Sequence, residues 1–142
     1  MATSANPSIL CAIDFSDSSL QALLWAIPEA QKHNYHISVL YPYRLDQIRK
    51  KEDAVKSKKE MDVDAVEKFD RLVSGMLRDG QVSFNFQSEV GFLRDRIREH
   101  ANKNNVVMLV MGKELAGEES FQELIGEVEV PIVIVPSKKH RN

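Results

Sequence analysis

The apolar positions of this chain follow two patterns, short continuous runs and longer stretches with helical spacing. Continuous runs are typical of strands that are buried on both faces of a parallel sheet. The sequence predicts such strands over residues 8–13, 36–41, 106–111 and 131–136. The second of these strands should stop at Pro42. Residues 82–88 instead alternate between apolar and polar side chains, which predicts a strand with one exposed face at an edge of the sheet.

Stretches with helical spacing lie between these strands. The first predicted helix covers residues 17–33 and begins at the N-cap side chains of residues 16–19. Pro28 removes one backbone hydrogen bond, so we expect it to kink this helix or to end its regular part early. Two shorter helices are predicted further along the chain, over residues 92–101 and 121–125.

A longer helix is predicted in the middle of the chain. It starts between residues 46 and 58, ends near Gly80, and buries one face made of Val63, Val66, Phe69, Val73, Met76 and Leu77. Basic residues dominate the stretch 44–59 and acidic residues dominate 60–70. We interpret this charge pattern as a solvated helix face with local ion pairs.

The alternating order of strands and helices predicts the fold class. Five strands with a helix between each pair indicate an α/β protein with an open parallel sheet and helices on both faces. The 142 residues are enough for one sizeable core, and the chain has no internal repeat and no interdomain linker. We therefore expect a single domain over residues 1–142, with loose ends at about 1–7 and 137–142.

Two strand ends carry residues that could bind a ligand, because ligands of such sheets bind beyond the carboxyl ends of the strands. Asp14 closes the first strand, and Met111-Gly112 closes the fourth. If these strands are neighbours, Asp14 and Gly112 border one crevice. Asp14 could accept hydrogen bonds from a ligand there, or it could equally bond the backbone of the turn at 15–17.

Composition excludes several classes of protein. Nineteen basic and 21 acidic residues give a net charge of −2, which argues against a nucleic-acid binder that neutralises phosphates. No apolar run approaches the roughly 18–20 residues of a membrane helix. The single cysteine, Cys11, rules out an internal disulfide and favours a reducing, cytoplasmic setting. The four histidines share no metal-ligand spacing. No nucleophile and base can be paired, so we expect no enzyme activity.

Several segments resemble universal stress proteins in sequence and in order. The resemblance rests on residues 9–19, 38–41, 107–112 and 130–135. It implies a five-stranded parallel sheet in the order 3-2-1-4-5, which agrees with the edge position expected for residues 82–88. Many members of the family bind ATP through a Gly-x-x-Gly segment after the fourth strand, followed further on by Gly-Ser or Gly-Thr. Backbone N–H groups can approach phosphates closely where side chains are absent.

This chain departs from the glycine pattern of the ATP-binding members. Gly112 stands at the first glycine, but Leu115 stands at the second, and Glu119-Ser120 falls at the Gly-Ser position of a shortened loop. Glu118 and Glu119 would add negative charge where phosphates lie. The resemblance therefore carries over only Asp14, Met111 and Gly112, as remnants of a nucleotide pocket.

Together these observations predict a non-catalytic, cytoplasmic stress-response or regulatory protein without a cofactor. It would act on an unidentified regulatory protein partner, with no nucleic acid or membrane partner, and as a homodimer. The dimer interface would be the unguarded apolar edge of the fifth strand, made of Ile132, Val133, Ile134 and Val135. The alternative is a nucleotide-binding module that takes AMP or ATP at the reduced site on strands one and four.

Overall fold

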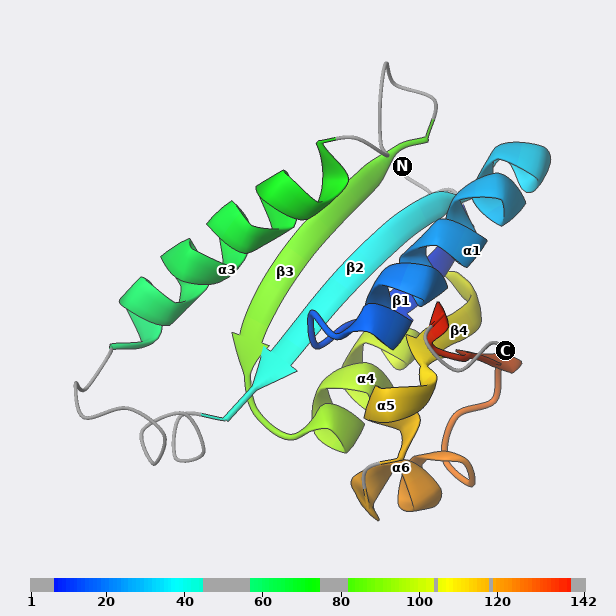
Figure 1. Ribbon diagram of the computed structural model, residues 1–142. Helices are drawn as coiled ribbons and strands as arrows, with labels where there is room; N and C mark the ends of the chain where they lie inside the picture. Colours follow the sequence, from blue (N-terminus) through cyan, green and yellow to red (C-terminus); the bar gives the residue numbers. More distant parts are fainter. Residues whose placement is uncertain (1–6, 45–56, 75–81, 104, 118, 139–142) are drawn as a thin grey trace.

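The computed structural model describes residues 7–44, 57–74, 82–103, 105–117 and 119–138. Its strands and helices alternate along the chain (Figure 1). In chain order they are β1 (Ser8–Ala12), α1 (Asp17–His33), β2 (His36–Tyr43), α3 (Lys58–Val73), β3 (Phe84–Val90), α4 (Leu93–Lys103), β4 (Val106–Gly112), α5 (Lys113–Ala116), α6 (Glu119–Leu124) and β5 (Ile132–Val135).

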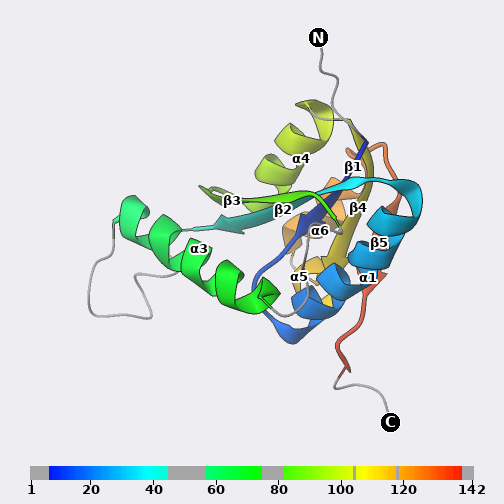
Figure 2. The ribbon, with the colours of Figure 1, turned by 90° about the horizontal axis from the view of Figure 1, so that it is seen from above.

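The five strands form one parallel sheet in the order β3-β2-β1-β4-β5. Helices α1 and α3 lie on one face of the sheet and α4 on the other (Figure 2). The predicted fold class is therefore confirmed, as is the edge position of the alternating strand. That strand runs over Phe84–Val90, slightly later than its pattern indicated.

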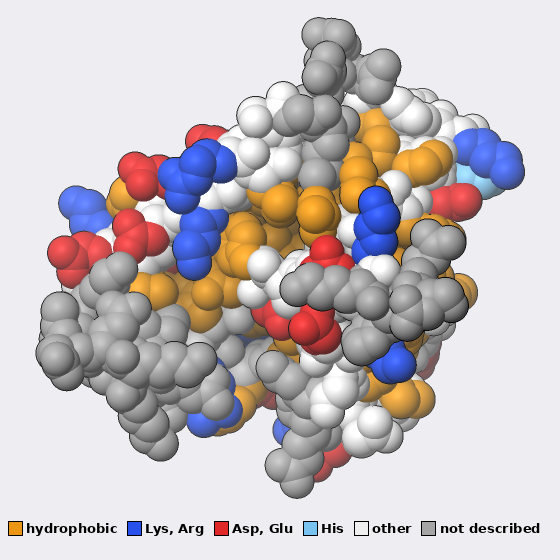
Figure 3. All heavy atoms as spheres, viewed as in Figure 1, with side chains coloured by type: hydrophobic (Ala, Val, Ile, Leu, Met, Phe, Trp, Pro, Cys, Tyr) orange, Lys and Arg blue, Asp and Glu red, His pale blue; other side chains and the backbone are white. Residues whose placement is uncertain are grey.

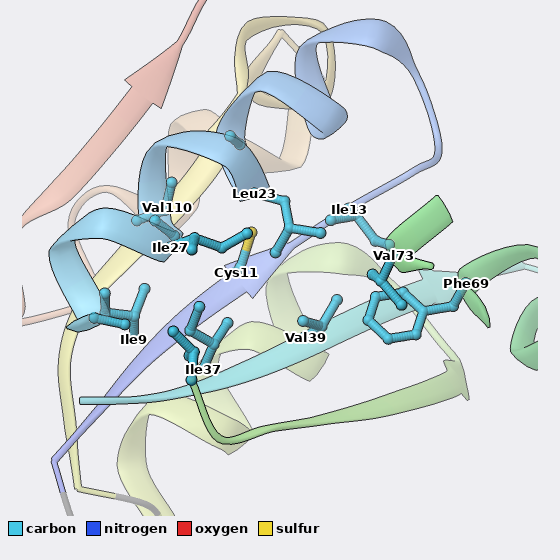
Figure 4. Close-up of a cluster of buried hydrophobic side chains, with 14 residues drawn as sticks. Ile9, Cys11, Ile13, Leu23, Ile27, Ile37, Val39, Phe69, Val73 and Val110 are labelled. Atoms are coloured by element: carbon cyan, nitrogen blue, oxygen red, sulfur yellow. The ribbon is translucent and has the colours of Figure 1, made fainter. Parts of the chain in front are cut away.

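Side chains along β1 alternate between the two faces of the sheet and divide the core into two clusters. Ile9, Cys11 and Ile13 join the cluster under α1 and α3, together with residues such as Leu23, Ile37, Phe69 and Val110 (Figure 4). Leu10 and Ala12 join the cluster under α4, α5 and α6, with Leu40, Ile97, Leu109, Met111, Leu115 and Leu124 among its other members. Both faces of β1 are thus buried, as a continuous apolar run predicts.

Helix α1 has the predicted bounds, and Pro28 does not end it early. The helix starts at the N-cap residue Ser16 and ends at Asn34, which adopts the left-handed conformation and donates its N–H to the Ala30 carbonyl. Pro28 lies on the exposed side of the helix. Water can therefore bond the carbonyl that the proline leaves without a partner.

The prediction that β2 stops at Pro42 is wrong, because the strand continues to Tyr43. Pairing with β1 ends at Leu40, whereas pairing with β3 continues through Pro42 and Tyr43. The carbonyls of Leu40 and Tyr43 bond towards β1 and β3 respectively, so the Pro42 nitrogen faces the side that β1 no longer covers. A proline there costs the sheet no hydrogen bond.

Helix α3 begins within the predicted window, where Ser57 and Glu60 form a capping box. Its predicted apolar face is only partly correct. Phe69 and Val73 are buried with Met61 and Ala65, but Val63 and Val66 are exposed by 49% and 46%. Helix α3 covers the edge of the sheet at β3, so only a narrow stripe with a spacing of four residues meets the core. The prediction that the helix ends near Gly80 is wrong, because α3 ends at Val73 with Ser74 as its C-cap residue. Gly80, Met76 and Leu77 themselves lie outside the described residues.

Candidate functional site at the ends of strands β1 and β4

The three candidate binding residues, Asp14, Met111 and Gly112, lie at the carboxyl ends of two neighbouring strands. Strands β1 and β4 are neighbours, and Ala12 is in register with Met111. Asp14 follows β1 and Gly112 ends the adjacent β4, at the centre of the sheet where the winding direction reverses. Met111 itself is fully buried in the core cluster under α4, so its side chain is committed to packing.

Asp14 holds the turn that leads into α1. Its Oδ1 atom accepts hydrogen bonds from Ser16 N at 3.0 Å, Ser16 Oγ at 2.5 Å and Ser19 Oγ at 2.7 Å. Its own backbone N–H donates to Ser19 Oγ at 2.9 Å. The carboxylate thus performs the turn-fixing role that the sequence allowed. All of these side-chain bonds converge on one of its two oxygens.

Phe15 lies inside this turn and has an unusual backbone conformation. Its φ angle of 65° is in the left-handed region, which few residues other than glycine adopt. The ring packs edge-on against Tyr41 with a centroid distance of 4.9 Å, and the Lys68 ammonium lies 5.4 Å from its centroid. Burial, followed by the charge of Asp14, raises the pKa of Tyr41. The packed rings of Phe15 and Tyr41 therefore lie beside Asp14.

Gly112 is required by close packing between β4 and the start of α1. A Cβ atom at this position would lie 2.5 Å from the Ser18 carbonyl carbon and 2.7 Å from the carbonyl oxygen, and would also meet Ser18 Oγ. The φ and ψ angles of Gly112 are −76° and 156°, which any residue can adopt. Steric contact, not backbone conformation, therefore selects glycine here.

Ser18 and Glu114 join the two helix starts by reciprocal hydrogen bonds. Ser18 N donates to Glu114 Oε1 at 3.2 Å, and Glu114 N donates to Ser18 Oγ at 3.1 Å. The next residue, Leu115, is buried in the core. Sequence reasoning gave Ser18 only a capping role and missed Glu114. No local pattern signals a pair that is separated by 96 positions.

A third acidic side chain lies on the first turn of α1. Asp17 Oδ2 accepts hydrogen bonds from Ser137 Oγ at 2.5 Å and from Lys138 N at 2.9 Å. The segment after β5 is thereby tied to the start of α1, and Ser137 is buried. Acidic side chains gather near the centre of the face shown in Figure 3. Glu118 and the side chains of Glu119 and Ser120 lie outside what the structure describes.

A second polar cluster ties α3 to the ends of β2 and β3. Asp62 Oδ1 accepts hydrogen bonds from Tyr43 Oη at 2.8 Å and Ser88 Oγ at 2.6 Å, and Lys58 Nζ lies 2.8 Å from Oδ2. Burial by itself would raise the pKa of Asp62, but the hydrogen bonds from these three donors outweigh it and lower the pKa. The sequence gave no indication of this cluster.

Among the described residues, no group of three or more His, Cys, Asp or Glu side chains could hold a metal ion. None of the described helices combines the length and the apolar character that crossing a membrane requires.

Comparison with known proteins gives a family and a set of similar folds. The model of the universal stress protein family matches residues 6–136. No curated protein matches the chain. Among solved structures, UspA from Lactobacillus plantarum has a TM-score of 0.67 and 15% identity, over 94% of this chain and 99% of its own.

Two other similar structures contain a nucleotide. The universal stress protein from Archaeoglobus fulgidus in complex with dAMP has a TM-score of 0.68 and 17% identity, over 92% of this chain and 97% of its own. A universal stress protein in complex with cAMP has a TM-score of 0.63 and 20% identity, over 95% of this chain and 100% of its own. Because the family model spans most of the sequence, and the strand order agrees with it, the chain belongs to the universal stress protein family.

Proposed function

We propose that this chain is a non-catalytic stress-response or regulatory protein that acts in the cytoplasm as a homodimer on a protein partner, with little affinity for ATP. The observation that carries the low ATP affinity is the contact between α1 and the turn after β4. Ser18 and Glu114 bond one another there, and buried Leu115 occupies the position of the second family glycine. Backbone N–H groups at this turn are therefore poorly placed to surround a triphosphate.

Calorimetric titration with Mg-ATP tests this proposal. We expect no binding tighter than about 100 μM, which corresponds to a binding free energy of about −5.5 kcal/mol. The control is a parallel titration of a stress protein with the intact glycine loop. ATP that co-purifies with this chain, or an affinity in the low micromolar range, would contradict the proposal.

The homodimer is supported by the position and character of β5. This strand lies at the edge of the sheet and, among the described residues, pairs with β4. Ile134 is 39% exposed, whereas Val133 and Val135 pack against the core cluster under α1. An exposed apolar edge strand invites pairing with a second chain, and two copies can cover one another about a two-fold axis. Pro131 and Pro136 would limit the pairing to a short register.

Sedimentation of the Ile134→Lys variant tests the dimer without damage to the core. A charge at this edge should leave the fold intact and make the protein monomeric at concentrations where the wild type is dimeric. Ile125→Lys is the matched control, because Ile125 is also an exposed isoleucine, at 51%, and is not part of β5. Stable homodimers are assembled at protein concentrations of tens of micromolar. A wild-type protein that sediments as a monomer in this range would exclude the dimer.

A second candidate function is a nucleotide-binding module that takes an AMP-sized ligand at Asp14 and Gly112. Two structures with the same fold carry dAMP and cAMP, which supports this candidate. A thermal-shift screen with adenosine, AMP, cAMP and ATP tests it, because a ligand that binds only the folded state raises the melting temperature. Asp14→Asn should reduce such a shift if Asp14 contacts the ligand. The absence of a shift with all four ligands would reject the candidate.

A further inference from the structure

Helix α3 carries an exposed stripe on the side that faces away from the core. Its members are separated by four, three and four residues, a spacing that keeps them on one side of a helix and is typical of surfaces that pair with another helix. Val63 and Val66 at its centre are exposed by 49% and 46%, and the charged residues at its two ends are exposed as well. We call this set the outer stripe: Lys59, Val63, Val66 and Asp70.

The described part of the chain leaves the outer stripe open to solvent. Helix α3 packs mainly against β3, and it lies at the margin of the molecule in both views of the ribbon (Figure 1, Figure 2). Among the described residues, neither Lys59 nor Asp70 takes part in an ion pair or a side-chain hydrogen bond. The neighbouring Lys58, by contrast, lies 2.8 Å from Asp62. The two end charges therefore have no compensating charge within the described ranges.

The order of residues in the outer stripe is self-complementary. A two-fold axis that crosses α3 between residues 64 and 65 places a second α3 antiparallel to the first. Lys59 then lies opposite the partner's Asp70, and Val63 lies opposite the partner's Val66, so that each pair occurs twice. A two-fold interface requires this reciprocity, because the same surface serves both copies. A parallel pair would instead place lysine on lysine and aspartate on aspartate, where like charges repel.

We propose that the outer stripe of α3 is a self-association surface, on which α3 of a second copy of this chain packs antiparallel. The valines supply the apolar centre of the contact, and the two lysine–aspartate pairs fix its direction and its register. This surface is separate from the β5 edge, because β3 and β5 are the two opposite edges of the sheet. Copies that pair at both surfaces would form tetramers or longer assemblies.

The contact between two outer stripes should be weaker than the pairing of two sheet edges. Its apolar part consists of two valines from each copy, and exposed ion pairs contribute little to association. Glu60 and Glu67, each one position after a member of the stripe, also bring like charges to its rim. We therefore expect a dissociation constant of about 100 μM to 1 mM, above the concentrations at which β5 edges pair.

Charge reversal at one end of the stripe tests the proposal in the Ile134→Lys variant, where β5 does not contribute to association. Lys59→Asp leaves a carboxylate at both ends of the stripe, and Asp70→Lys leaves an ammonium group at both ends. Each change suits the helix dipole, which favours acidic residues at the start of a helix and basic residues near its end, so α3 should be preserved. Lys68→Asp is the matched control, since Lys68 is an exposed lysine on the same helix but lies over Phe15.

Sedimentation equilibrium at about 500 μM protein measures the association, because this concentration lies within the expected range of dissociation constants. Circular dichroism verifies the fold of every variant. We expect Ile134→Lys, with or without Lys68→Asp, to form a mixture of monomers and dimers. Lys59→Asp and Asp70→Lys should each be monomeric in this background. Their equimolar mixture should associate again, because every carboxylate of the stripe then meets an ammonium group.

Four results would overturn the proposal. One is an Ile134→Lys protein that remains monomeric at this concentration. Another is association of the two charge-reversed variants to the same extent as Ile134→Lys. The third is an equimolar mixture that stays monomeric, since the order of charges would then not decide the pairing. The fourth is loss of association in the Lys68→Asp control, which would assign the effect to net charge rather than to the outer stripe.

Discussion

Replacement of Gly112 by alanine should test the packing of α1 on β4 more sharply than any other single change. The added methyl would lie 2.5 Å from the Ser18 carbonyl carbon, and backbone cannot rotate away as a long side chain can. The φ angle of −76° suits alanine, so the variant carries no conformational strain of its own. The loss of stability in Gly112→Ala therefore reports on the steric contact with Ser18 and its consequences, without a contribution from backbone strain.

Two contributions determine how much the Gly112→Ala substitution should lower the free energy of unfolding. Overpacking of a closely packed site costs about 1–3 kcal/mol, and a backbone contact belongs at the upper end of this range. A displaced α1 also weakens the two hydrogen bonds between Ser18 and Glu114, which contribute about 1 kcal/mol each. The free energy of unfolding should thus fall by about 3–5 kcal/mol. For a domain of this length, the melting temperature should decrease by about 10 °C or more.

Thermal unfolding followed by circular dichroism measures this effect against a control on the same short helix. At Gly117, the C-cap of α5, an added Cβ would meet only carbonyl oxygens at 3.6 Å and 3.7 Å. Gly117→Ala should therefore change stability by less than about 1 kcal/mol, and in the stabilising direction. If the two variants melted within about 2 °C of one another, the close contact between Gly112 and Ser18 would be refuted.

The carboxylates and the thiol give three further predictions. Asp14→Asn should lower the unfolding free energy by about 1 kcal/mol in urea denaturation, and an unchanged midpoint would mean that Asp14 does not hold the turn. Because hydrogen bonds lower the pKa of Asp62 below its ordinary 3.8, its stabilisation is present above that pH and lost as the pH falls through the folded-state value. The stability gap between wild type and Asp62→Asn should therefore close in strong acid, and a constant gap would contradict this. Burial raises the pKa of Cys11 to about 12, so thiol reagents should label it only after unfolding, and rapid labelling of the folded protein would contradict its burial.

The strongest periodic patterns of the sequence predicted their elements correctly. Helix α1 has its predicted bounds, since Ser16 caps it and apolar residues repeat along one face. The continuous apolar runs of β1 and β4 predicted strands buried on both faces, because only a strand covered on both faces needs apolar side chains at every position. Asp14 and Gly112 were expected to border one crevice only if these two strands are neighbours, and the pairing of β1 with β4 meets that condition.

The incorrect predictions concern positions where the surroundings, not the local pattern, decide the outcome. Pro42 can lie within β2 because β1 ends before it and no hydrogen bond to its nitrogen is needed. The local sequence around Pro42 does not indicate where the neighbouring strand β1 ends. Val63 and Val66 satisfy a helical apolar spacing, yet they are exposed because α3 covers only the edge of the sheet. The sequence pattern does not contain the width of the surface that a helix will meet.

The sequence alone therefore determined the order of the strands and of the longer helices along the chain and the parallel arrangement of the sheet, but not the short helix α5. These properties depend on hydrophobic periodicity and on short-range capping, which local sequence encodes. Tertiary structure alone decided that Gly112 is a packing residue against Ser18, and that Glu114 bonds the first turn of α1. These contacts join residues about 95 positions apart. They exist only once β1 and β4 are paired, so the chemistry of the strand-end site is a property of the assembled sheet.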